Sequence, residues 1–279
     1  MAPRPLPVRP LGRALTIPNH AKVVESKEGA SHRGMTLDQS ASRLMQLPLE
    51  LRQMIYRAAI GNSKMHMLLK KHKLGHIRCK ASNARECPLE CNLGPDNIWS
   101  PFAEPVEEPT DGDVLPLLLT CRQIYSEAID AVYSSNCFSF SDLDCLRYFS
   151  CTILPHRWAL VQTLDIEWCI SWPIYDPIAQ TLLVSRPALY PPHDEATWEA
   201  TWRIISNMSN LKSLRVSLMY FDWFRDPGCE EGLLAPLRQV TLPRKFEVHL
   251  SWAGEEIKDA PFQLFRPDVR VPELGDGWI

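Results

Sequence analysis

The chain has 279 residues, 45% of them hydrophobic and 23% charged, which is enough for one large core or two smaller ones. Its 30 Lys and Arg against 33 Asp and Glu give a net charge of -3, which argues against a dedicated nucleic-acid binder. No apolar run approaches the roughly 20 residues of a membrane span, and no secretory signal pattern opens the chain. The 9 cysteines include no C-x-x-C pair, which favours reduced thiols. We therefore expect an intracellular protein of the cytoplasm or nucleus, without a membrane partner.

Residues 1–40 form a tail rich in proline and arginine. The prolines prevent helix and favour an extended polyproline conformation, so we expect this tail to be disordered. Arg4, Pro7 and Pro10 fit the R-x-L-P-x-x-P pattern that SH3 domains bind with aromatic grooves and an acidic pocket. A proline-rich tail also produces so short a pattern by chance. An SH3 domain is thus one candidate partner of the tail, and the absence of a partner is the alternative.

A short amphipathic helix is predicted within residues 44–60, because Pro48 suits a first helical turn and Gly61-Asn62 is a good helix stop. Its apolar stripe consists of Leu47, Leu51, Met54 or Ile55, and Ala58. A second helix followed by a strand is predicted over residues 115–140, with an apolar face at Leu117, Cys121, Ile124, Ala128 and Val132.

Both helices carry motifs. LPLELRQMIY at residues 47–56 resembles the first helix of an F-box, and TCRQIYSEAIDAVY from residue 120 resembles the F-box helix with a Cys-Arg pair. Together they resemble a large fungal family of F-box-like proteins of unknown function, with an LPxELRxxIY opening and a TCRQIYxEA helix. The resemblance implies a substrate receptor or adaptor that binds the adaptor subunit of a cullin ubiquitin ligase. An ordinary F-box has its helices close together in sequence, whereas residues 61–113 separate these two.

The apolar stripes of the two helices allow two interpretations. Such stripes usually face a core, which favours mutual burial of these side chains. The alternative is a protein-binding face on the first helix, formed by Leu47, Leu51 and Ile55.

Between the helices, alternation predicts a β-hairpin over residues 64–80, and residues 81–113 are expected to form a long surface loop. His and Cys side chains are ligands that Zn²⁺ prefers, and this region offers His72, His76, Cys79, Cys87 and Cys91. Their spacing matches no established zinc motif, so incidental residues are the favoured interpretation and no cofactor is predicted. The hairpin also contains basic residues that face either phosphate or solvent.

The rest of the chain alternates helical and strand patterns, which predicts an α/β fold with helices packed on a partly parallel sheet. The wording L-x-x-L-x-I/V resembles leucine-rich repeats, but its spacing is irregular, so we expect a degenerate version of that architecture. The sheet should run in chain order through Phe138, Leu164, Leu214 and Phe246. We expect a single domain over residues 41–255, with a second long loop at 171–197 and an irregular tail at 256–279.

Catalytic motifs are absent from the sequence, including G-x-S-x-G, the Walker P-loop, H-E-x-x-H and G-x-G-x-x-G. Cys151 with His156, and Asp165 with Glu167, are the pairs closest to a catalytic pattern. No third group orients His156, and the two acids are expected to form a solvated strand edge, so no enzymatic activity is predicted. Most of the 9 tryptophans are expected to pack in the core, whereas Trp172 and Trp223 are candidate exposed contact residues.

These observations favour a non-catalytic protein–protein interaction module that binds its partner through the loop edge of the predicted sheet. The leading alternative is a zinc-stabilised module that binds nucleic acid through the hairpin at residues 64–80, and an unrecognised hydrolase is a third. Metal content, salt-sensitive nucleic-acid binding and copurification with ligase components distinguish the first two.

Overall fold

The computed structural model describes residues 42–70, 73–79, 114–170, 174–175, 195–220, 227–254, 257 and 259–267. Several sequence predictions lie outside these ranges. They are the SH3 pattern at Arg4, Pro7 and Pro10, the loop at 81–113, most of the loop at 171–197, and the residues His72, Cys87, Cys91, Trp172 and Trp223.

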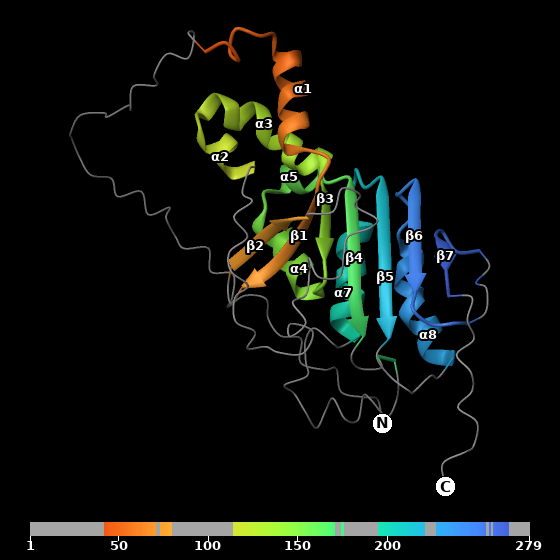
Figure 1. The fold of residues 1–279 in the computed structure, drawn as a ribbon. Coiled ribbons are helices and arrows are strands. Elements are labelled where there is room, and N and C mark those ends of the chain that lie inside the picture. Colours follow the sequence, from red (N-terminus) through yellow and green to blue (C-terminus); the bar gives the residue numbers. More distant parts are fainter. Residues whose placement is uncertain are drawn as a thin grey trace.

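The described residues form a seven-stranded sheet with the strand order β2-β1-β3-β4-β5-β6-β7 (Figure 1). Its strands are β1 (Lys64–Lys70), β2 (Lys73–Arg78), β3 (Cys137–Phe140), β4 (Thr163–Ile170), β5 (Ser213–Tyr220), β6 (Lys245–Leu250) and β7 (Gln263–Phe265). The predicted hairpin is confirmed, because β1 and β2 pair antiparallel, and all other pairs are parallel. The predicted strand order is confirmed as well, since the register aligns Phe138, Leu164, Leu214 and Phe246 in one row.

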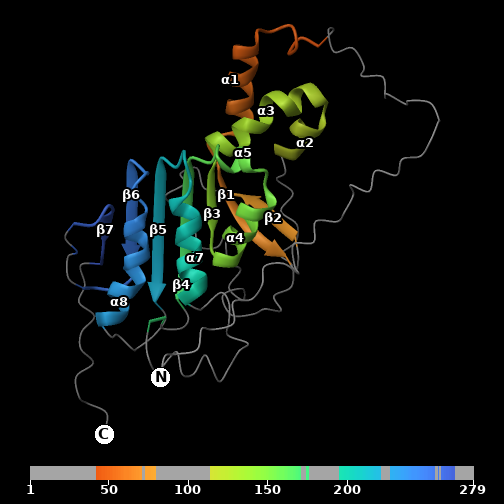
Figure 2. The ribbon, with the colours of Figure 1, turned by 180° about the vertical axis from the view of Figure 1, so that it is seen from behind.

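One face of the sheet carries the connecting helices. They are α4 (Leu143–Thr152), α5 (Pro155–Trp158), α7 (Glu195–Ser206), α8 (Pro227–Leu234) and the 3₁₀ helix η5 (Ala235–Gln239). Figure 2 shows α4, α7 and α8 in front of this face. Crossovers between parallel strands are right-handed, and each successive strand from β3 to β6 is added on the same side, so the connecting helices fall on one face. The α/β class predicted from sequence is thereby confirmed.

The core lies between the sheet and these helices. Alternate residues of β4 enter it, and Trp168 stacks on Trp198 of α7 with ring centroids 4.7 Å apart. Trp202 meets Trp198 edge-on at 5.2 Å, and both are fully buried. The prediction that most tryptophans pack in the core holds for the described Trp168, Trp198, Trp202 and Trp252.

A unit of three helices lies at one end of the sheet, at the top of Figures 1 and 2. It contains α1 (Leu49–Ile60), α2 (Val114–Leu119) and α3 (Arg122–Ser135), and α3 contacts both of the others. The prediction of one continuous helix from residue 115 is wrong, because the chain breaks at Thr120 and Cys121. Cys121 has extended φ and ψ, and its sulfur accepts a hydrogen bond from the backbone N–H of Ile124, so it caps α3.

Two further sequence predictions concern the end of α1 and the C-terminal tail. The predicted helix stop is confirmed: α1 ends at Ile60, and Asn62 has a left-handed φ of 57°. The irregular tail expected from residue 256 contains β7, which pairs parallel with β6, and the preceding Phe262 is buried against Phe246. A strand of three residues gives too short an alternation to be recognised in the sequence.

Candidate functional site

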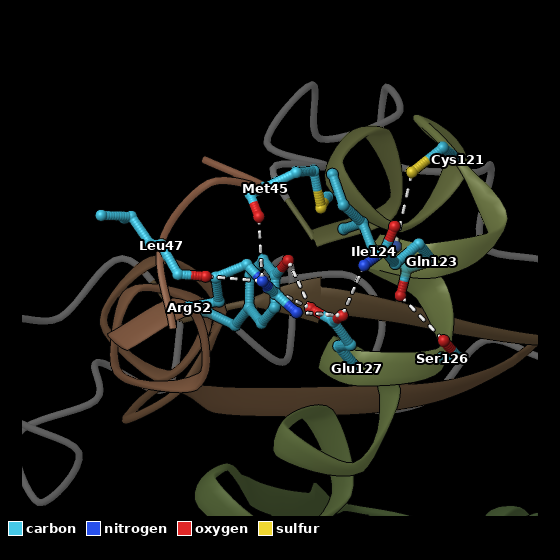
Figure 3. A network of polar contacts seen from close by, with 9 residues as sticks. Met45, Leu47, Arg52, Cys121, Gln123, Ile124, Ser126 and Glu127 are labelled. Carbon is cyan, nitrogen blue, oxygen red and sulfur yellow. Dashed lines mark hydrogen bonds and ion pairs between the residues drawn. The ribbon is translucent and has the colours of Figure 1, made fainter. Parts of the chain in front are cut away.

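An ion pair fixes α1 against α3. The Nε of Arg52 donates to Oε2 of Glu127 at 2.8 Å, and its Nη2 donates to Oε1 at 2.7 Å. Tyr56, one turn further along α1, donates its hydroxyl to the same carboxylate at 3.1 Å. Figure 3 shows this carboxylate on α3 facing the guanidinium. Two-point pairing between a guanidinium and a carboxylate defines both distance and orientation, so it sets how α1 lies on α3.

Arg52 also holds the segment that leads into α1. Its Nη1 donates to the backbone carbonyls of Leu47 at 2.6 Å and Met45 at 3.2 Å. On α3, the side-chain amide of Gln123 donates to Glu127 at 3.0 Å. These donors, with Arg52 the strongest, hold the pKa of the Glu127 carboxyl below its ordinary value. The pair therefore carries its charges at neutral pH.

A second contact joins the C-terminal ends of α1 and α3. The buried amide of Asn136 donates to the carbonyls of Ile60 at 2.8 Å and Val132 at 3.0 Å. Gly61 lies so close to α3 that an added Cβ would come within 2.7 Å of the Ser135 hydroxyl. With Arg52 at one end and Asn136 at the other, α1 is fixed along its length.

The opposite face of α1 is apolar and open to solvent. Leu51 is 45% exposed, Met54 63% and Ile55 42%, and Ala58 is exposed on the same face. Mutual burial, the interpretation favoured from sequence, is therefore wrong for Leu51 and Ile55, while Leu47 is half-buried. On α3, Ile124 is buried and Val132 half-buried, as expected. The residues of α1 that are buried are Tyr56 and Ile60, because the Arg52 ion pair turns this side toward α3.

The face of the sheet opposite the helices is polar. The register brings His66 of β1, Ser139 of β3, Asp165 of β4, Arg215 of β5 and Glu247 of β6 into one row across the strands. These residues occupy the alternate positions between apolar ones in segments such as TLDIEW and KFEVHL. That alternation was the signal available in the sequence, although sequence reasoning did not combine it into a row.

A buried lysine crosses this polar face. The Nζ of Lys64 lies 2.9 Å from Asp165 and 2.6 Å from Glu167, and its side chain is 1% exposed. Burial raises the pKa of Asp165, although Lys64 acts in the opposite direction. The expectation of a solvated edge at Asp165 and Glu167 is wrong for Asp165, which is 4% exposed on a central strand. Lys64 is therefore not part of the basic hairpin surface that was predicted to face phosphate or solvent.

The polar row does not form a catalytic triad. Ser139 lies between His66 and Asp165, so the acid is not positioned to orient the histidine toward the serine. Within the described residues, the Ser139 hydroxyl and one Asp165 oxygen have no hydrogen-bond partner. Cys151 and His156 are both exposed. No group of three or more metal-binding side chains occurs in the described part of the chain, where only His76 and Cys79 of the zinc candidates are included.

Arg52, Tyr56 and Glu127 were not identified as candidate site residues from the sequence. Each lies inside one of the two motifs, at a position that the apolar stripe does not use. Polar residues at motif positions outside the apolar stripe were the signal from which this contact could have been inferred.

The chain was compared with curated proteins, solved structures and models of protein families. No match was found among curated proteins or solved structures. Separately, no helix in the described ranges is long and apolar enough to cross a membrane. A family model described as a domain of unknown function, DUF7730, matches residues 37–268, which include both motif helices and the whole described sheet. The chain belongs to this DUF7730 family.

Proposed function

We propose that this protein is a non-catalytic protein–protein interaction module that binds its partner through the exposed apolar face of α1. The observation that supports this proposal is the exposure of Leu51, Met54 and Ile55 on a helix whose other side is fixed by an ion pair. Exposed apolar residues at helical spacing are the anchors with which a helix enters a groove on a partner.

The adaptor subunit of a cullin ligase is the partner that the F-box-like motifs indicate. Residues 61–113 separate the motif helices in sequence, yet α1 packs directly on α3 and α2 packs on the same helix. The intervening chain contributes β1 and β2 to the sheet, so the insertion does not separate the helices in space. This arrangement supports a role as an F-box-like substrate receptor or adaptor.

Nothing in the described residues favours the zinc-stabilised nucleic-acid module. Lys64, one of the hairpin's basic residues, is buried between two carboxylates and cannot reach a phosphate. His76 is exposed on β2, without a described group of metal ligands around it.

A pull-down of the full-length protein with the purified adaptor tests the proposal. Leu51→Asp should abolish binding, because it places a charge at the centre of the apolar face. The matched control is Leu242→Asp, since Leu242 is 52% exposed between η5 and β6. Circular dichroism should show that both variants fold. Equal binding by wild type and Leu51→Asp, or no binding by wild type, would contradict the assignment of the adaptor to this face.

A further inference from the structure

The exposed face of α1 follows a heptad pattern. Leu51, Met54 and Ala58 are spaced by three and four residues, and all three are exposed. They lie opposite Tyr56 and Ile60, which are buried against the rest of the protein. Residues at this spacing form the contact seam between two helices, and the small Ala58 permits a close approach.

Two exposed charges lie beside this seam, on the same flank. Glu50 immediately precedes Leu51, and Arg57 immediately precedes Ala58, so they occupy the same heptad position one repeat apart. In an antiparallel pair of helices, equivalent flanks face each other. Glu50 would then meet Arg57 of the second copy, and Arg57 would meet Glu50 of the second copy. A parallel pair would instead place Glu50 beside Ile55 of the second copy and Arg57 beside a position past the end of the second helix, so neither charge would be matched.

We propose that the apolar face of α1 pairs with the same face of a second copy of this chain, antiparallel and with reciprocal Glu50–Arg57 ion pairs. The fold leaves room for this contact, because α1 lies at the outer end of the molecule, beyond the sheet (Figures 1 and 2). The helix has only 12 residues, so the dimer is weak and depends on protein concentration. It goes beyond the proposed function, and it competes with the adaptor because both use the same surface.

Sedimentation velocity of the full-length protein over a concentration series tests the pairing, with Glu50→Arg and Arg57→Glu measured alone and as an equimolar mixture. Each variant alone brings like charges together at both contacts, and we expect its dimer to weaken by about tenfold. In the mixture, one variant carries two positive charges beside the seam, and the other variant carries two negative charges there. Dimer formation should therefore return to at least the wild-type level.

The mixture is its own control for folding, because it contains only the two variants that fail alone. Circular dichroism of each should match wild type, since both positions are exposed. A monomeric wild type, unchanged dimerisation of the single variants, or a mixture no better than either variant would overturn the proposal. A monomeric wild type that still binds the adaptor would overturn self-pairing alone, and a wild-type dimer without adaptor binding would overturn only the choice of the adaptor.

Discussion

The sheet layer and the three-helix unit differ in the direction that their apolar stripes face. The stripes of the sheet layer are buried, whereas the stripe on α1 is exposed. In the sheet layer, apolar stripes such as Trp198 and Trp202 on α7 are buried, as periodicity predicts. In the three-helix unit, the stripe on α1 faces solvent, and the Arg52–Glu127 ion pair joins α1 to α3. An apolar stripe therefore identifies a face of a helix, but contacts elsewhere on that helix decide whether the face is turned inward.

The two regions also differ in how they hold a carboxylate. Glu127 has its pKa lowered, chiefly by the hydrogen bonds from Arg52. Asp165 has its pKa raised, because the cost of burial exceeds the attraction of Lys64. Ionisation of Glu127 therefore stabilises the folded state, whereas ionisation of Asp165 destabilises it.

The largest loss of stability is expected in the sheet layer, from Trp198→Ala. Trp198 is fully buried, stacks on Trp168, and donates its Nε1 to the carbonyl of Leu233 at 3.0 Å. We expect the free energy of unfolding to fall by about 3–5 kcal/mol. Urea denaturation measures it, with Leu242→Ala at an exposed position as the control. A loss below about 1 kcal/mol would show that the two layers do not pack as described.

Removing the buried lysine should have the next largest effect. Lys64→Met leaves Asp165 and Glu167 without their cation, and we expect a loss of about 3 kcal/mol, at the low end for a buried pair because the Glu167 side chain is 19% exposed. Adding Asp165→Asn should recover part of the loss, since it removes one of the two unpaired charges. Denaturation of the single and double variants measures this coupling. A double variant less stable than Lys64→Met would contradict it.

Smaller and opposite pH dependences are expected from the two carboxylates. The folded pKa of Glu127 lies below its ordinary 4.5, so its contribution is present above pH 4.5 and is lost as pH falls through the folded value. Asp165 has a folded pKa above its ordinary 3.8, so stability falls as pH rises from there through the folded value. The advantage of wild type over Glu127→Gln should thus shrink on acidification, whereas its stability relative to Asp165→Asn should improve.

Thermal unfolding between pH 3 and 7 measures both effects. At pH 7, Glu127→Gln should lower Tm by about 2–4 °C. Glu127→Gln keeps the size of the side chain, so a lower Tm reports the charge of the ion pair. The same sign of pH dependence for both variants would contradict the assigned difference between the two regions.

The smallest effect on stability is expected on the exposed face of α1. Leu51→Asp should change the free energy of unfolding by less than about 0.5 kcal/mol, because the side chain is already 45% exposed. Denaturation alongside Ile60→Asp, at a buried position of the same helix, provides the contrast. A loss for Leu51→Asp comparable to that of Ile60→Asp would mean that the face is buried.

The sequence was sufficient for those parts of the fold that local patterns determine. Alternation located the hairpin, and the repeated wording around Leu164, Leu214 and Phe246 predicted neighbouring parallel strands in the correct order. It was not sufficient where contacts join distant residues. Arg52 and Glu127 are 75 positions apart, and Lys64 and Glu167 are 103 apart, so no local pattern connects them. The outward direction of Leu51 depends on the first of these contacts.

Methionine oxidation shows whether a partner covers the apolar face of α1, and the chain contains its own controls for it. Met54 is 63% exposed on the apolar face of α1, whereas Met65 and Met67 are 2% and 8% exposed in β1. In dilute peroxide, and at a protein concentration too low for α1 to pair with a second copy, Met54 should oxidise faster than the other two, and a saturating amount of the adaptor should slow its oxidation selectively. Peptide mass spectrometry gives the three rates. Selective protection of Met54 would place the partner on α1, and an unchanged Met54 rate with the adaptor bound would show that the adaptor does not bind this face.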